Sequence, residues 1–132
     1  MMQVLKYQRP AIWWALFVLL ICNIKMGDSV NDSPMFFAGF DKLVHCGLFF
    51  VFAVFVAYGW IRQVGAENFK WTAALKVFMI ALCFGALIEV LQLYIFTWRN
   101  GDFEDLFADA VGVGMGVFSI LVTLNASANA KS

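Results

Sequence analysis

Four long apolar segments, separated by short polar ones, are the feature that most limits how this chain can fold. Hydrophobic residues make up 63% of the 132 residues and charged residues only 14%, against about 45–50% and about 25% in an average soluble protein. A soluble domain of this size has too small an interior to bury so much apolar surface. The sequence therefore predicts an integral membrane protein.

Each apolar segment is long enough to cross a bilayer as a helix, which takes about 17–25 residues. Pro10 suits the start of the first, because the missing N–H of proline costs nothing in the first turn of a helix. Residues 27–40 favour a loop, and the small polar tail, 125–132, is expected to be frayed. The predicted fold is all-α: a single domain over residues 1–132, built as an integral membrane bundle of four transmembrane helices. The predicted spans are 10–26, 41–60, 71–98 and 104–124.

The distribution of lysine and arginine predicts the orientation, because cytoplasmic loops carry an excess of these residues. With the N-terminus inside, the cytoplasmic residues are Lys6, Arg9, Arg62, Lys70, Lys76 and Lys131, and the outer ones are Lys25, Lys42 and Arg99. This bias predicts that both termini are cytoplasmic. The starts of the second and fourth spans, and the end of the third, then face outward.

Ionisable and amide side chains occur at these outward-facing ends, beside segments that are otherwise hydrocarbon. Glu89 and Gln92 are three residues apart and therefore share one helix face. On the fourth span, one stripe is made by Asp105, Asp109, Gly112 and Gly116. The glycines let another helix come close, which draws the carboxylates into the bundle. Charges in hydrocarbon usually mark function or line a shared polar cavity, so we expect one polar site that faces outward.

The candidate ligand-binding residues are Asp41, Lys42, His45, Glu89, Gln92, Arg99, Asp105 and Asp109. Arg99 suits a bidentate carboxylate or phosphate contact, and Lys42 offers a point charge. His45 and Glu89 are the candidate acid and base if the site is catalytic. A metal held by Asp41, His45, Glu89 and Asp105 is a further possibility. No metal site is predicted, because the nearby cations compete for these groups, and no cofactor is predicted.

Several candidates also have a purely structural explanation. Asp41 can cap the helix that begins beside it. Glu89 can form an ion pair with Arg99 or Lys42, and Gln92 can make an interhelical hydrogen bond. Solvated positions in a turn or a first helical turn are expected for Asp102 and Glu104.

Four short motifs follow one another along the chain. They are Asp41-Lys42-x-x-His45, then Glu89-x-x-Gln92, then Arg99, then Asp105-x-x-x-Asp109-x-x-Gly112-x-x-x-Gly116. In this order they resemble the pattern of VanZ-like membrane proteins, from about the first span to the fourth. The resemblance implies a small bacterial multi-pass protein of the cytoplasmic, or inner, membrane. The named member of that family is associated with resistance to teicoplanin, a glycopeptide that acts on the cell envelope.

The expected function is to bind, or act on, a component of the cell envelope in an outward-facing polar pocket. Besides the bilayer itself, the expected partner is a phosphate-bearing lipid or cell-wall precursor, since Arg99, Lys42 and His45 suit a phosphate. The alternative is a membrane-embedded enzyme that modifies a lipid or precursor head group by His/Glu acid–base chemistry, although no GxSxG nucleophile motif occurs. A proton or ion relay is a third hypothesis. A net charge of zero argues against nucleic acid, and no oligomeric state is predicted.

Overall fold

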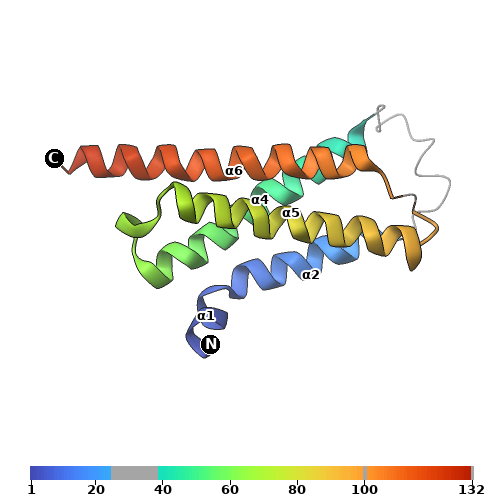
Figure 1. Ribbon diagram of the computed structural model, residues 1–132, viewed down its shortest axis with the longest axis horizontal. Coiled ribbons are helices and arrows are strands. Elements are labelled where there is room, and N and C mark those ends of the chain that lie inside the picture. Colours follow the sequence, from blue (N-terminus) through green and yellow to red (C-terminus); the bar gives the residue numbers. More distant parts are fainter. Residues whose placement is uncertain (25–38, 100, 132) are drawn as a thin grey trace.

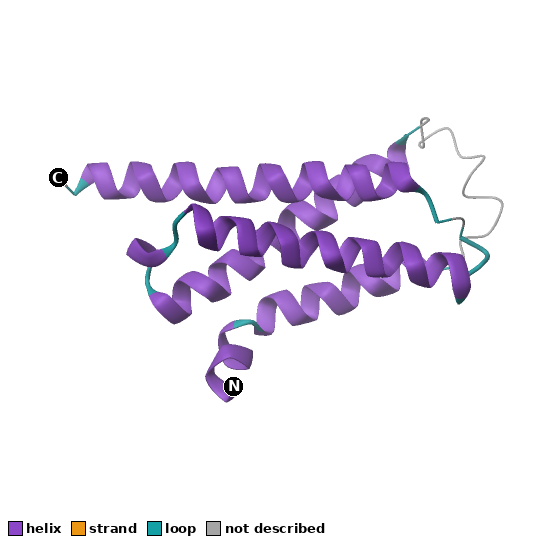
Figure 2. Cartoon of the chain, in the orientation of Figure 1, coloured by secondary structure: helices purple, strands orange, loops and turns teal. Residues whose placement is uncertain are grey.

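The computed structural model describes residues 1–24, 39–99 and 101–131, and the prediction of an all-α fold is confirmed. Figures 1 and 2 show that the described residues are mostly helical. In chain order the helices are α1 (Met2–Tyr7), α2 (Arg9–Asn23), α4 (Phe40–Val64), the 3₁₀ turn η1 (Ala66–Asn68), α5 (Trp71–Tyr94) and α6 (Phe103–Ala130). The predicted loop at 27–40 lies outside the described residues, apart from Gly39 and Phe40.

Three helices, α4, α5 and α6, are long and apolar enough to cross a membrane by length and composition. The remaining apolar helix, α2, has 15 residues. At 1.5 Å per residue it is about 22 Å long, shorter than the roughly 30 Å hydrocarbon core. The structure thus supplies helices of spanning length for the second, third and fourth predicted spans. The predicted first span ends beyond the described part of α2.

Two predicted boundaries were wrong. The tail was expected to be frayed after Leu124, whereas α6 continues to Ala130. The alanines in the sequence NASANA favour this extension, because alanine has the highest helix propensity. The third helix ends at Tyr94 rather than near Trp98, and a turn follows.

The central helix is α4, which contacts α1, α2, α5 and α6. Its closest neighbour is α6, because the glycine stripe of α6 faces the α4 backbone. A Cβ added at Gly116 would lie 2.8 Å from the Phe50 carbonyl oxygen, and one at Gly112 would overlap the carbonyl oxygen of Cys46. Phe49 and Phe52 of α4 pack with Phe84 of α5 in the core.

The arrangement of the helices brings three distant parts of the sequence to one end of the bundle. Figure 1 shows the start of α4, the end of α5 and the start of α6 at this end. The connection between α4 and α5 and the C-terminus lie at the opposite end. The polar residues predicted to form a site therefore share one end of an otherwise apolar bundle.

Candidate functional site

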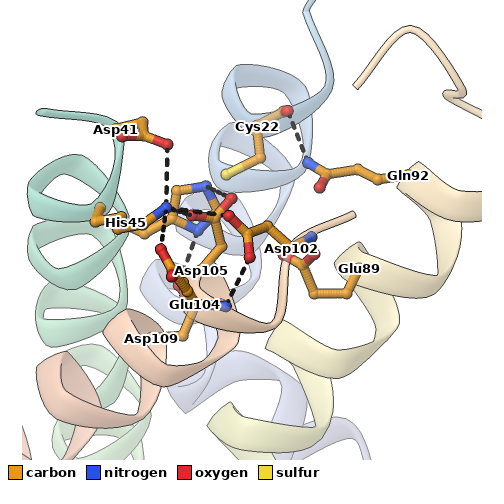
Figure 3. A network of polar contacts seen from close by, with 10 residues as sticks. Cys22, Asp41, His45, Glu89, Gln92, Asp102, Glu104, Asp105 and Asp109 are labelled. Carbon is orange, nitrogen blue, oxygen red and sulfur yellow. Dashed lines mark hydrogen bonds and ion pairs between the residues drawn. The ribbon is translucent and has the colours of Figure 1, made fainter. Parts of the chain in front are cut away.

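The residues that gather at this end are called the polar cluster below. They are Asp41, Lys42 and His45 of α4, Glu89 of α5, and Asp102, Glu104, Asp105 and Asp109 at the start of α6. Figure 3 shows the side chains converging from the three helices. Acidic groups outnumber basic ones in this cluster, and the contacts below show which acid each base holds.

Lys42 joins four carboxylates. Its Nζ lies 3.1 Å from Asp102, 3.2 Å from Asp105, 3.3 Å from Glu104 and 3.6 Å from Asp41. Asp102 and Glu104 were expected to be solvated and are indeed partly exposed, but Lys42 also ties them to α4. One ammonium group thus clamps the start of α6 against the start of α4.

The start of α6 is fixed by its own cap. Asp102 occupies the N-cap position, and its Oδ1 accepts a hydrogen bond of 2.9 Å from the Glu104 N–H. This bond, together with the neighbouring Lys42 ammonium, lowers the pKa of the Asp102 carboxyl below its ordinary value of 3.8. Asp102 therefore stays charged at the positive end of the helix, where a carboxylate is favoured.

His45 and Asp109 form the innermost pair of the cluster. His45 Nδ1 lies 2.9 Å from Asp109 Oδ1, and both side chains are buried. The second ring nitrogen, Nε2, lies 3.8 Å from Asp105 Oδ2. The imidazole is therefore held between two carboxylates of α6 that are one helical turn apart.

Glu89 binds a backbone amide rather than a cation. Its Oε2 accepts a hydrogen bond of 2.7 Å from the Asp102 N–H, which closes the connection between α5 and α6. Neither Arg99 nor Lys42 forms an ion pair with Glu89 among the described residues, in contrast to the structural explanation considered above. Glu89 thus supports the same helix start that Lys42 clamps.

Gln92 makes the interhelical hydrogen bond expected from the sequence. Its Nε2 donates to the Cys22 carbonyl oxygen at 3.0 Å, and Trp98 Nε1 donates to the Asn23 carbonyl oxygen at 3.1 Å. The last carbonyls of a helix have no partner within it, so both bonds satisfy the end of α2. Sequence reasoning missed Asn23 and Trp98 because nothing in their local pattern indicates a partner far along the chain.

Among the described residues, Arg99 forms no ion pair with the polar cluster, and Asp41 pairs with Lys42 alone. Arg99 is half-buried in the turn between α5 and α6, and its guanidinium makes no ion pair with any residue in the described ranges. Asp41 does not cap α4, because the cap position falls on Gly39, whose φ of 85° suits glycine. The half-exposed Asp41 carboxylate lies in the first turn, beside Lys42.

A comparison with protein families matched the chain over residues 4–124 to the family described as VanZ/LLP1. The chain belongs to the VanZ/LLP1 family. Comparisons with curated proteins and with solved structures gave no match. The family match covers the four apolar helices up to Leu124 and the whole polar cluster, and the apolar helices make this a multi-pass membrane protein.

Within this VanZ/LLP1 domain, one subset of the polar cluster has the geometry of a metal site. His45, Glu89 and Asp109 each offer a ligand atom, and these three atoms lie within 4.8 Å of one another. The sequence-based set for a metal contained Asp41 and Asp105 in place of Asp109. The helix stripe alone did not show that Asp109, one turn deeper than Asp105, faces both His45 and α5.

Proposed function

We propose that the polar cluster lies at the outer face of a cell membrane and binds a component of the cell envelope there. The observation that carries this proposal is the meeting of charged side chains from three helices inside a bundle that is otherwise apolar. Such groups are costly beside hydrocarbon and are retained mainly where they serve a function. Structural ion pairs alone would be a poor reason to keep them, since hydrophobic replacements are often as stable.

The proposed orientation has four crossings, with both termini in the cytoplasm. It is supported by the basic residues at the end of the bundle opposite the cluster, among them Arg62 at the end of α4 and Lys76 in α5. Lys76 also lies over the Trp60 ring, with its Nζ 5.7 Å from the ring centroid. An amphipathic pair of this kind suits the membrane interface.

Reporter fusions test this orientation. A reporter of membrane sidedness fused after Gly65 should report a cytoplasmic location. The same reporter fused after Gly101 should report an external location. The reverse result would overturn the orientation and place the cluster on the cytoplasmic side.

The ligand we favour is a lipid or cell-wall precursor that carries a phosphate, approached through Arg99. Lys42 is already surrounded by four carboxylates, so it is less suited to an anion than the sequence suggested. The guanidinium of Arg99 has no ionic partner among the described residues and suits a bidentate phosphate contact. The anionic part of the ligand is therefore assigned to Arg99 and the remainder to the acidic cluster.

Native mass spectrometry of the detergent-purified protein tests binding directly. Wild-type protein should retain an envelope molecule that Arg99→Ala loses and Arg99→Lys holds less tightly, because lysine keeps the charge but not the fork. Glu67→Gln, at the opposite end of the bundle, is the control and should retain the molecule. Equal retention by Arg99→Ala and wild type would contradict the assignment of Arg99.

A second function, acid–base modification of a head group, is favoured by the hydrogen bond between His45 and Asp109. A buried carboxylate that holds an imidazole is the arrangement by which enzymes orient a general base. Glu89→Gln separates the two functions, because glutamine can still accept the Asp102 amide proton through its carbonyl oxygen. If the protein is an enzyme that uses Glu89 as acid or base, Glu89→Gln abolishes the envelope phenotype, such as altered teicoplanin susceptibility. If the protein only binds its ligand, Glu89→Gln largely keeps that phenotype.

A further inference from the structure

Three buried side chains in the polar cluster come from three different helices. His45 belongs to α4, Glu89 to α5 and Asp109 to α6, and their exposed fractions are 2%, 8% and 0%. Their ligand atoms lie within 4.8 Å of one another. An imidazole and two carboxylates form a donor set that suits Zn²⁺ and other divalent transition metals.

Two buried oxygens in this group have no hydrogen-bond partner among the described residues. They are Oε1 of Glu89 and Oδ2 of Asp109. Leaving a buried charged acceptor unpaired costs more free energy than leaving a neutral one unpaired. The two oxygens are therefore positions at which a bound cation would be stabilised.

The unpaired oxygen of Asp109 is turned toward α5. A Cβ added at Gly85 would lie only 2.8 Å from Asp109 Oδ2. Gly85 precedes Glu89 by one helical turn, so the two positions share a face of α5. The absence of a side chain at Gly85 lets Asp109 approach the part of α5 that carries Glu89.

The cations that argued against a metal in the sequence do not occupy this place. The carboxylate partners of Lys42 are Asp41, Asp102, Glu104 and Asp105, and none belongs to the group of three. Arg99 forms no ion pair with Glu89 or Asp109 either, as far as the described residues show. Within residues 1–24, 39–99 and 101–131, neither unpaired oxygen therefore has a lysine or arginine side chain in contact with it.

We propose that His45, Glu89 and Asp109 bind a divalent transition-metal ion, with Zn²⁺ as the reference case. The 2.9 Å between His45 Nδ1 and Asp109 Oδ1 is somewhat shorter than the spacing of two ligands on one tetrahedral ion, which is about 3.4 Å for metal–ligand bonds of about 2.1 Å, so an ion would widen this pair by about half an ångström. Glu89 completes the set by a small movement of its side chain. The Nε2–H of His45 then faces Asp105, which serves as the outer carboxylate that metal-bound histidines commonly have.

Three protein ligands leave one coordination position open, as in zinc sites that bind a further molecule. Because the ion sits in the cluster assigned above to envelope binding, its biological role depends on that proposed function. Metal binding by the purified protein does not, so the two can fail separately.

The chain contains a single histidine, His45, and this makes the test specific. The protein is purified in detergent without a polyhistidine tag, stripped with EDTA and titrated with Zn²⁺ by calorimetry. We expect one ion per chain. A second sample with ¹⁵N-labelled imidazole is loaded with Cu²⁺, and pulsed electron paramagnetic resonance should detect coupling to the labelled nitrogen. Failure to bind Zn²⁺, or copper without imidazole coupling, would overturn the site.

The variants Glu89→Gln and Asp109→Asn should each weaken Zn²⁺ binding by more than the roughly 10–100-fold that loss of an outer-shell partner costs. Glu67→Gln makes the same chemical change outside the cluster and should bind Zn²⁺ as the wild type does. Wild-type affinity in both cluster variants would contradict the proposal. If a variant does not fold, the imidazole coupling in the wild type still decides. Arg99→Ala should keep Zn²⁺ while losing the envelope molecule, which distinguishes this site from the proposed function.

Discussion

The close approach of α6 to α4 at Gly112 supports a quantitative prediction for Gly112→Ala. A Cβ at this position would overlap the carbonyl oxygen of Cys46, which is a backbone atom and can move only with its helix. Cys46 directly follows His45, and Gly112 lies one turn after Asp109 on α6. Separating the helices here therefore also pulls His45 away from Asp109.

The expected destabilisation of Gly112→Ala follows from three contributions. Overpacking typically costs about 1–3 kcal/mol. The bond between His45 and Asp109 is 2.9 Å long, so a separation of about 0.6 Å takes it beyond hydrogen-bond range, and a buried bond to a charged group is worth about 1.5–3 kcal/mol. The higher helix propensity of alanine offsets up to about 1 kcal/mol of this loss in the free energy of unfolding. The net loss should be about 1.5–6 kcal/mol.

The measurement is reversible unfolding by SDS in mixed micelles, followed by far-ultraviolet circular dichroism. Gly114→Ala is the matched control on the same helix, because a Cβ there would meet only Phe78 Cε2, at 3.9 Å. It gains helix propensity without a clash and should be unchanged or more stable by up to about 1 kcal/mol. Equal stability of Gly112→Ala and Gly114→Ala would refute the close contact between α4 and α6.

Three further predictions concern single contacts. Because the folded-state pKa of Asp102 lies below its ordinary value, the stability that its carboxylate contributes is present above that value and is lost as the pH falls through the folded pKa. The midpoint temperature of unfolding should thus fall more steeply between about pH 6 and about pH 3 for wild type than for Asp102→Asn. Gln92→Met leaves the Cys22 carbonyl without its donor and should cost about 1–2 kcal/mol in the SDS assay, whereas an unchanged midpoint would contradict the bond between α5 and α2. Gly85→Ala, whose Cβ would crowd Asp109 Oδ2, should lower both stability, by about 1–3 kcal/mol, and Zn²⁺ affinity; wild-type affinity would show that Asp109 does not need this approach.

The sequence indicated most of the residues that gather in the polar cluster, but not that Asp102 and Glu104 join them through Lys42, nor which bonds the others form. Helix periodicity placed Asp105 and Asp109 on one stripe with Gly112, and the structure has that stripe facing α4. Periodicity did not indicate that Glu89 binds a backbone amide or that Arg99 stays without an ionic partner in the described ranges. These outcomes depend on the exact position of a side chain that comes from another helix. A small shift in that position decides which of several possible partners is within hydrogen-bond range.

The class of structure follows from the amino-acid sequence alone. Apolar segments of membrane-spanning length require helices, because a bilayer leaves no water to satisfy the backbone. The tertiary structure decided how those helices pair and which donor reaches which acceptor. In a bilayer the hydrophobic effect does not favour one helix pair over another, so close packing and interhelical hydrogen bonds make the choice. For this chain, the contact of Gly112 with the Cys46 carbonyl and the bond of His45 to Asp109 are where that choice is made.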